Sequence, residues 1–134
     1  MKNRIEFLDL GLQPLANSYL KKYQLKKKEK NYRLKVCFDK NTKLVSIKKK
    51  FSSQVMFDNE YPYRSSMSKT MINSFKKLAQ NIMHRYRPKK ILEIGSNDGS
   101  FLKNFNKKKT IGVEPCTNIE KITKKLKFNT IGKY

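Results

Sequence analysis

The segment from Lys89 to Phe105, KKILEIGSNDGSFLKNF, constrains the fold more than any other part of the chain. The apolar run Ile91–Ile94 has the length and composition of a buried strand. Two glycines with three residues between them follow, and the amphipathic segment SFLKNF then opens a helix. This order predicts a strand, a tight loop and a helix, which together form the repeating unit of a parallel sheet.

The same alternation continues to the end of the sequence. TIGVE predicts a second strand, NIEKITKKL a second helix, and FNTIGKY the beginning of a third strand. Strands that alternate with helices form right-handed parallel sheets, so the sequence predicts an α/β fold. Such a sheet is normally covered on both faces.

The segment between Ser66 and Pro88 has the clearest helical pattern. Ser66 or Ser68 is suited to cap its start, and Pro88 marks its end. We expect this helix to cover one face of the parallel sheet. Its apolar residues recur at three- and four-residue spacing: Met71, Ile72, Phe75, Leu78, Ala79, Ile82, Met83 and Tyr86.

The N-terminal part of the chain predicts a small β-rich module. Residues 1–20 mix apolar residues with the turn formers Gly11 and Pro14, so we expect a segment that wraps a surface and contains one short strand. Further on, YRLKVCF and KLVSIKK alternate as strands do, and DKNT between them suits a turn. These two runs predict a hairpin.

Composition leaves two explanations for the charge. The 134 residues carry a formal net charge of +22, which suits a nucleic-acid or anionic-membrane partner. The charge is nearly all lysine and comes with abundant Asn and Ile, so A/T-rich coding with a solvated surface is the competing explanation.

No apolar run approaches the ~20 residues of a membrane span, and the N-terminus has no signal-peptide core. We expect a cytoplasmic protein.

The glycine loop is in the right place for a ligand, because open α/β sheets bind ligands beyond the carboxyl ends of their strands. Gly95 permits a sharp turn and Gly99 a close contact between helix and strand. Glu114 ends the next strand, about twenty residues after Gly95, where an acid can accept both hydroxyls of a ribose.

The residues around the loop disfavour a phosphate. No lysine follows Gly99 as in a phosphate-binding loop, and Asn97 replaces the second glycine of a dinucleotide motif. Glu93, Asp98 and Glu114 would also repel phosphate. S-adenosylmethionine has no phosphate, carries a sulfonium and an ammonium group, and offers a ribose diol. The loop therefore favours S-adenosylmethionine.

Two groups of residues carry a family resemblance. Glu93–Gly99 with Ile111–Pro115 resembles the cofactor-binding half of class I S-adenosylmethionine-dependent methyltransferases. With Phe7–Leu20 and Tyr61–Ser68, the chain resembles the sugar C-methyltransferases that methylate nucleotide-linked deoxysugars, in which a small zinc-binding module precedes the methyltransferase domain. The resemblance implies a degenerate module at 1–60, a linker and helix at 61–88, and half of a Rossmann-like methyltransferase domain at 89–134.

The sequence also differs from this family in ways that lead to further expectations. Family members have two Cys-x-x-Cys pairs, but no such pair precedes the Leu-Gly segment here, and Lys40 stands where the partner of Cys37 is expected. We expect no zinc, because one cysteine cannot replace four ligands. The family's sheet has more strands, and its catalytic histidines and acids would lie beyond Tyr134. We expect a fragment, a split subunit completed by a second chain, or a remnant.

The resemblance and the loop together give the candidate site residues. The expected cofactor contacts are Ser66, Glu93, Gly95, Ser96, Asn97, Asp98, Gly99, Glu114 and Pro115, and Tyr63 is the candidate catalytic residue. Each has a plainer alternative: the loop is only a turn, Asp98 is a helix cap, and Tyr63 packs. His84 is expected at the surface, and Cys37 and Cys116 as small apolar core residues.

The function implied is S-adenosylmethionine binding within a methyltransferase that acts on a carbon of a nucleotide-linked sugar. A base would remove a proton beside a carbonyl, and the carbanion would attack the sulfonium methyl group. The alternative from another class is a lysine-rich nucleic-acid-binding protein. A third is an inactive remnant with an exposed strand edge.

Overall fold

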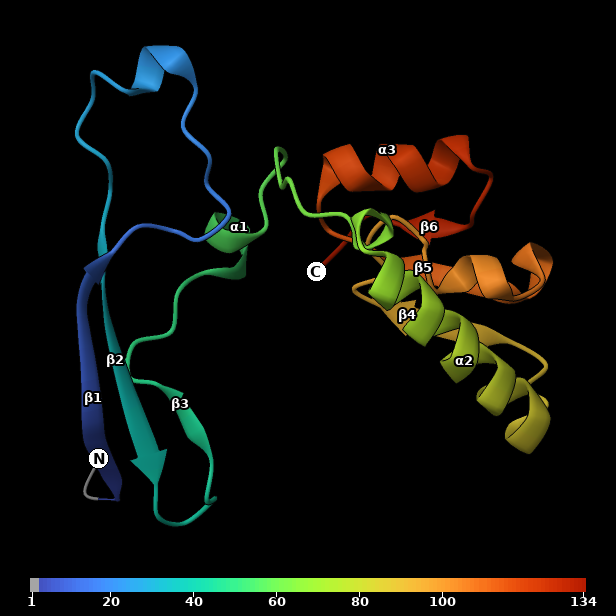
Figure 1. The fold of residues 1–134 in the computed structure, drawn as a ribbon, viewed down its shortest axis with the longest axis horizontal. Coiled ribbons are helices and arrows are strands. Elements are labelled where there is room, and N and C mark those ends of the chain that lie inside the picture. Colours follow the sequence, from blue (N-terminus) through green and yellow to red (C-terminus); the bar gives the residue numbers. More distant parts are fainter. Residues whose placement is uncertain (1–2) are drawn as a thin grey trace. The chain divides into compact units, whose positions relative to one another are not determined.

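The computed structural model describes residues 3–134, and the chain divides after Met56 into two compact units. We call the part up to Met56 the N-terminal unit and the part from Phe57 the C-terminal unit. Each unit has its own three-stranded sheet, antiparallel in the first and parallel in the second (Figure 1). The predicted α/β fold is therefore confirmed, and the parallel sheet is consistent with part of a Rossmann-like sheet.

The sheet of the N-terminal unit contains β1 (Arg4–Gln13), β2 (Tyr32–Asp39) and β3 (Val45–Ile47), in that order. The predicted hairpin of β2 and β3 is confirmed. Asp39 stabilises its turn, because its Oδ1 accepts hydrogen bonds from the backbone N–H groups of Asn41 at 2.9 Å and Thr42 at 3.0 Å. Short helical segments lie at η1 (Lys22–Gln24) and α1 (Ser53–Met56).

The expectation of one short strand near the N-terminus is wrong, because β1 has 10 residues. Gly11 does not end the strand. It adopts a φ of +73° and donates its N–H to Asp9 Oδ1 at 2.9 Å, beside an irregularity in the pairing between Asp9 and Leu12. A local bulge of this kind lets the strand pass through a turn-forming residue and continue its pairing with β2.

The C-terminal unit confirms the predicted order of strands and the long helix. Strands β4 (Ile91–Ile94), β5 (Thr110–Val113) and β6 (Thr130–Ile131) are parallel and adjacent in sequence order. The short turn η2 (Ser65–Met67) leads into α2 (Lys69–Tyr86), and α3 (Thr117–Lys125) connects β5 to β6.

The ends of α2 have identifiable causes. Ser68 rather than Ser66 is the N-cap, because its Oγ accepts a hydrogen bond from the backbone N–H of Met71 at 3.2 Å. Arg87 has a left-handed φ of +46°, and Pro88 follows it, so the helix stops where the sequence predicted.

The helix expected directly after the glycine loop does not form. The chain makes two single turns instead, η3 (Leu102–Asn104) and η4 (Lys107–Lys109). Asn104 explains the first interruption, since its side-chain Nδ2 donates to the carbonyl oxygens of Ser100 and Phe101 and competes with helical bonding. Asn106 then caps η4 by accepting from the N–H of Lys108 at 3.0 Å.

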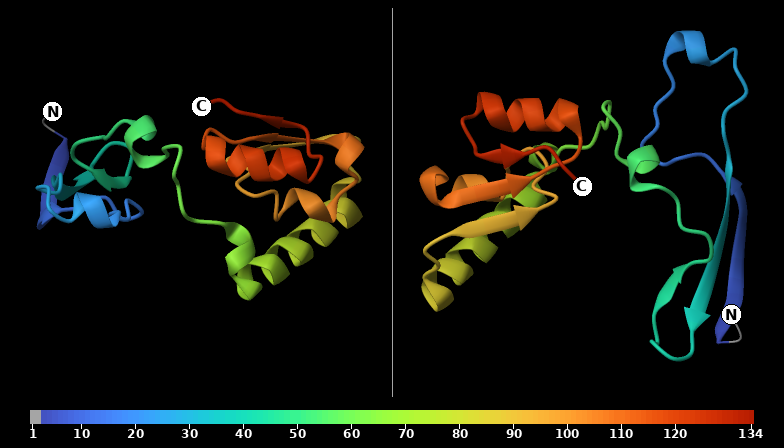
Figure 2. Two further views of the ribbon diagram at one scale, coloured as in Figure 1. Left: turned by 90° about the horizontal axis from the view of Figure 1, so that it is seen from above. Right: turned by 180° about the vertical axis from the view of Figure 1, so that it is seen from behind.

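The core of the C-terminal unit lies on one face of its sheet. Leu102, Cys116, Ile119 and Thr123 are almost completely buried there, and Phe75 of α2 packs against Phe101 with ring centroids 5.5 Å apart. The other face contrasts with it, because Leu92 and Ile94 of β4 are 61% and 81% exposed. The general expectation that both faces are covered is wrong for residues 3–134. The view from behind in Figure 2 shows β4 and β5 in front of α2.

Among the residues that the structure describes, no helix combines the length and hydrophobicity that crossing a lipid bilayer requires.

Candidate functional site

The glycine loop between β4 and η3 is tied to the end of β5. The backbone N–H groups of Gly95 and Ser96 both donate to the carbonyl oxygen of Val113, at 2.8 and 3.0 Å. Gly95, Asn97 and Gly99 have left-handed φ values of +73°, +46° and +76°. A Cβ atom added at Gly95 would meet nothing within 4 Å, so this corner of the loop is open to a ligand.

Glu114 lies against the loop, as the proposed site requires. Its side chain is 4% exposed, its Oε2 accepts from the N–H of Asn97 at 2.8 Å, and its Oε1 accepts from the N–H of Cys116 at 2.9 Å. A carboxylate has about four acceptor positions, so these two N–H groups do not use the full capacity of Glu114. Pro115, which follows Glu114, is half-buried.

Asp98 and Asn97 fasten the segment before α2 to the loop. Asp98 Oδ2 accepts from the N–H of Ser66 at 3.0 Å, and Asn97 Oδ1 accepts from the N–H of Ser65 at 2.9 Å. Asn97 also donates from Nδ2 to the carbonyl oxygen of Tyr63 at 3.2 Å. The structure therefore brings the predicted residues Tyr63 and Ser66 next to the glycine loop.

Asp98 caps a turn rather than a helix. Its Oδ1 accepts from both the N–H and the hydroxyl of Ser100, at 3.2 and 2.6 Å. Burial raises the pKa of Asp98, but the hydrogen bonds from Ser100 and Ser66 outweigh it, so the pKa lies below its ordinary value. Asp98 is thus a fixed negative charge at the loop. Sequence reasoning missed Ser100, whose only signal is its position two residues after an aspartate.

Glu93 differs from Asp98, because its pKa is raised and not lowered. Its Oε2 is buried and has no hydrogen-bond partner among the described residues. Burial, followed by the nearby charges of Asp98 and Glu114, raises the pKa of Glu93 to about 7. A positively charged group beside Oε2 would relieve this cost, so the residues at the loop fit a cationic ligand such as S-adenosylmethionine.

The remaining residues singled out from the sequence differ in their exposure to solvent. Ser96 of the loop is 3% exposed and its side chain packs against Gly112, whereas Tyr63 is 42% exposed. His84 is exposed on α2, as expected. Cys116 is buried, and burial together with Glu114 raises the pKa of its thiol to about 12, so this cysteine is neutral and a poor nucleophile.

One cavity borders the loop on the side of Ser66. It has a volume of about 160 Å³, and its lining includes Asp98, Gly99, Lys103 and Phe128 but neither Gly95 nor Glu114. Ligand pockets usually exceed ~300 Å³. This cavity is smaller than that and does not reach Gly95 or Glu114. Gly99 faces inward, because a Cβ added there would be 3.2 Å from the ring of Phe128.

The surroundings of Cys37 do not fit a zinc ion. This buried cysteine lies in a groove of about 630 Å³ in the N-terminal unit. Zinc requires thiolate, imidazole or carboxylate ligands, usually four in a structural site. Apart from Glu6 and Cys37, the groove is lined by cations, namely Arg4, Arg33, Lys35, Lys48 and Lys49. Within residues 3–134, no three His, Cys, Asp or Glu side chains are grouped to hold a metal.

Ion pairs connect the strands around this groove. Glu6 of β1 pairs with Lys35 of β2, and with Lys48, which follows β3, at 2.8 Å. Asp9 pairs with Arg33 at 2.6 Å. Hydrogen bonds from Lys35 and Lys48 lower the pKa of Glu6, and a hydrogen bond from Arg33 lowers that of Asp9 to about 2. Both carboxyls are therefore charged at neutral pH.

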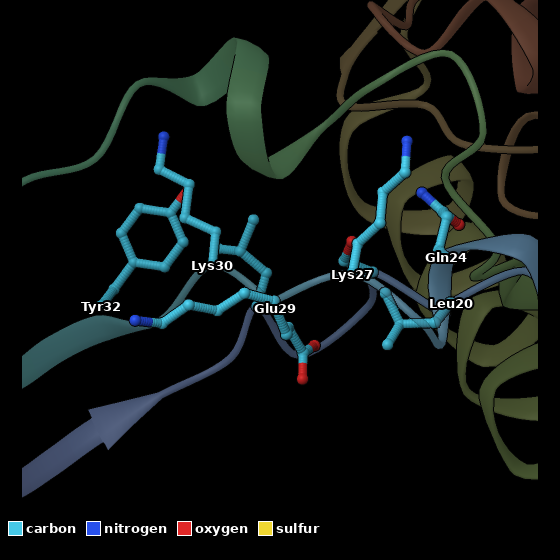
Figure 3. A pocket seen from close by; sticks show the side chains of 9 residues that line it. Leu20, Gln24, Lys27, Glu29, Lys30 and Tyr32 are labelled. Atoms are coloured by element: carbon cyan, nitrogen blue, oxygen red, sulfur yellow. The ribbon is translucent and has the colours of Figure 1, made fainter.

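A second pocket of the N-terminal unit, of about 320 Å³, is also basic (Figure 3). Lys27, Lys28 and Lys30 line it with Glu29, and the ammonium group of Lys30 lies 5.5 Å from the centroid of the Tyr32 ring. Leu15 and Leu20 give the pocket an apolar part.

Comparison with known families relates the N-terminal module to methyltransferases. Residues 1–57 match a methyltransferase-associated family model that is described as a "putative zinc binding domain". No curated protein matches the chain. The matched range ends one residue after Met56, where the N-terminal unit ends. The N-terminal unit of this chain is therefore similar to a methyltransferase-associated zinc-binding module, although its groove does not fit zinc.

Proposed function

We propose that this chain is the S-adenosylmethionine-binding part of a methyltransferase that acts on a carbon of a nucleotide-linked sugar. The observation that carries the proposal is the position of Glu114, whose carboxylate is held against the glycine loop by the N–H of Asn97 at 2.8 Å. The unpartnered Oε2 of Glu93, on the strand that leads into the loop, supports it. The match of residues 1–57 adds the relation to methyltransferases.

Each acid has a separate role in this proposal. Glu114 accepts the two ribose hydroxyls of the cofactor on its remaining acceptor positions. Glu93 and Asp98 attract the positive charges of the methionine part and repel the phosphates of nucleotides. When bound, S-adenosylmethionine supplies an electrophilic methyl group. Tyr63, next to the loop, is the residue of this chain proposed to position the donor or to assist removal of the acceptor's proton.

Calorimetric titration with S-adenosylmethionine and with ATP tests the proposal. We expect S-adenosylmethionine to bind and ATP to bind at least tenfold more weakly. Glu114→Ala should weaken S-adenosylmethionine binding at least tenfold, or about 1.4 kcal/mol, because it removes hydrogen bonds to a charged acceptor. The thermal melt of the variant reports whether it remains folded.

Glu120→Ala is the matched control for this experiment. Glu120 lies on α3 and pairs with Lys124 at 2.6 Å, so its removal should leave cofactor binding unchanged. Equal binding of ATP, or equal losses in the two variants, would show that the loop is not selective for S-adenosylmethionine.

The basic pocket of Lys27, Lys28 and Lys30 supports a second candidate, a nucleic-acid-binding protein. Phosphate contacts by lysines make such binding strongly dependent on salt. Titration of labelled single-stranded RNA at low and high salt tests this candidate. A steep salt dependence that is reduced by Lys27→Gln, together with no heat from S-adenosylmethionine, would favour it over the methyltransferase.

A further inference from the structure

The groove that contains Cys37, which we call the cationic groove, is lined from one face of the N-terminal sheet. Arg33, Lys35 and Cys37 alternate along β2, so their side chains point to the same face. Residues directly opposite each other on paired strands also share a face, and Glu6 of β1 lies opposite Cys37. Lys48 is held beside β2, because its backbone N–H donates to the carbonyl oxygen of Lys35 at 2.8 Å. Three segments of the chain therefore bring charged side chains to one groove.

Positive charge exceeds negative charge in the cationic groove. Its lining contains five cations and one carboxylate, that of Glu6. Ion pairs add two carboxylates, since Asp9 contacts Arg33 at 2.6 Å and Asp39 contacts Arg4 at 3.5 Å. Five cations against three carboxylates leave two positive charges without compensation. A ligand with two negative charges would neutralise them.

The carboxylates also hold several of the cations in place. Glu6 pairs with both Lys35 and Lys48. Lys35 lies, in addition, 3.4 Å from Asp9. A side chain that is already held loses less conformational freedom when it binds a ligand. Lys49 differs from these cations, because it is exposed and has no hydrogen-bond or ion-pair partner among the described residues. The groove thus combines fixed cations with one that is free to move onto a ligand.

The arrangement of the cations suits two neighbouring anionic groups. Arg33 and Lys35 are two residues apart on β2, which is ~6.6 Å along a strand. The planar guanidinium of an arginine can bind one phosphate through two N–H groups, and lysine ammonium groups attract a second phosphate. The groove has a volume of about 630 Å³, within the ~300–1,000 Å³ of small-molecule sites. It therefore has room for organic groups attached to the phosphates.

Other classes of ligand fit the cationic groove less well. A metal cation would be repelled by the uncompensated positive charge. A nucleic-acid strand carries a charge on every phosphate along its length, so it would meet the carboxylates of Glu6 and Asp9 as well as the cations. A diphosphate concentrates its negative charge in one short group.

We propose that the cationic groove of the N-terminal unit binds a small organic diphosphate. Arg33 and Lys35 hold the phosphates, and Lys49 moves onto them from the segment after β3. The proposal goes beyond the cofactor site and does not depend on it, because the groove shares no residue with the glycine loop. Solvent and salt screen these partly exposed cations, so binding here should be weaker than that of S-adenosylmethionine at the loop.

UDP-glucose, in which the diphosphate carries an organic group at each end, provides the probe. Hydrogen exchange of the full chain should slow in peptides from residues 3–56 with UDP-glucose. It should not change with uridine, which has no phosphate, or with sodium sulfate at the same ionic strength. Protection confined to residues 57–134 would place the ligand in the other unit and overturn the proposal. Protection by inorganic pyrophosphate but not by UDP-glucose would assign the groove to the free inorganic ion and also overturn it.

Lys49→Gln tests the groove itself. It removes one of the two uncompensated charges and breaks no ion pair among the described residues, so it should weaken UDP-glucose binding about threefold in calorimetry. Lys22→Gln is the matched control, because Lys22 is exposed on η1 and does not line the groove. It carries the same change of charge and should leave binding unchanged. Equal losses in the two variants would show that the net charge of the chain attracts the ligand, which would overturn the proposal.

The cationic groove and the glycine loop can be tested separately. Lys49→Gln should weaken UDP-glucose and ATP but leave S-adenosylmethionine binding unchanged, whereas Glu114→Ala should do the reverse. Failure of either result leaves the other standing. Labelled single-stranded RNA tests the competing occupant. RNA binding that depends steeply on salt and weakens in Lys49→Gln, without binding of UDP-glucose, would assign the groove to nucleic acid and overturn the proposal.

Discussion

At the scale of the residue, Glu93 combines burial with two neighbouring negative charges. Its pKa is raised from the ordinary value of 4.5 to about 7. Between these pH values the folded chain holds a proton that the unfolded chain has lost, so this group's contribution to stability falls as pH rises from 4.5 to 7. Glu93→Gln should remove this dependence. Urea unfolding of both proteins at pH 5 and pH 8 measures it.

A bound cation would reverse the preference of Glu93 for its proton. The positive charges of S-adenosylmethionine favour the carboxylate, so binding at pH 6.5 should release a proton. Calorimetry in two buffers with different heats of ionisation measures this release, which should disappear in Glu93→Gln. Uptake of a proton, or no buffer dependence in the parent chain, would contradict the placement of the cation beside Glu93.

Gly95 and Gly99 have nearly the same backbone but different surroundings. Their φ values are +73° and +76°, yet a Cβ atom would meet nothing at Gly95 and the Phe128 ring at 3.2 Å at Gly99. Both alanine variants should lose about 1 kcal/mol or more of unfolding free energy, because alanine is strained in a left-handed backbone conformation. Gly99→Ala should lose further stability from crowding. Denaturant unfolding compares the two, and equal losses would contradict the close contact.

Much of this site was predictable from residue types, and the rest depended on three-dimensional contacts. Glu114 follows a strand beside a glycine loop, and topology alone places it near Asn97. Its hydrogen bond from the N–H of Cys116, two residues further on, is a local contact that the sequence analysis did not anticipate. The fastening of Ser65 and Ser66 to the loop joins residues 32 positions apart, so sequence spacing could not reveal it.

At the scale of the element, Ser68 fixes the start of α2. Ser68→Ala removes the acceptor of the Met71 N–H and should cost about 1 kcal/mol of unfolding free energy. Ser74→Ala is the matched control within the same helix. Because Ser74 is exposed in the helix interior and alanine is the better helix former, that variant should be neutral or slightly stabilising. Chemical denaturation measures both, and losses of equal size would contradict the capping role.

Elements with strong periodicity were predicted better than elements decided by side-chain hydrogen bonds. The pattern of α2 repeats over 18 residues, and the β2–β3 turn carries residues suited to it, so both were predicted correctly. The segment after Gly99 has a short amphipathic pattern, but Asn104 and Asn106 bond to nearby backbone and divide it into single turns. Gly11 had the opposite effect, because it bends β1 without ending it.

At the scale of the whole molecule, the division after Met56 separates two cores. The N-terminal sheet is joined by ion pairs around a groove whose cations disfavour a metal. The C-terminal unit holds the acids of the proposed cofactor site. The chain, with a formal net charge of +22, therefore contains a locally negative site in its C-terminal unit. Net charge alone pointed to nucleic acid, whereas the positions of Glu93, Asp98 and Glu114 favour a cation.

Two separate cores predict that ligand binding stabilises only one of them. S-adenosylmethionine at 100 times its dissociation constant should stabilise the unit that binds it by about 2.7 kcal/mol. Hydrogen exchange followed by mass spectrometry should therefore show slower exchange in peptides from residues 57–134 and unchanged exchange in residues 3–56. Addition of zinc or a chelator should change neither set, because the lining of the Cys37 groove disfavours a metal. Protection of both units by S-adenosylmethionine would show that they unfold as one, and protection of residues 3–56 by zinc would show that the cationic groove still binds a metal.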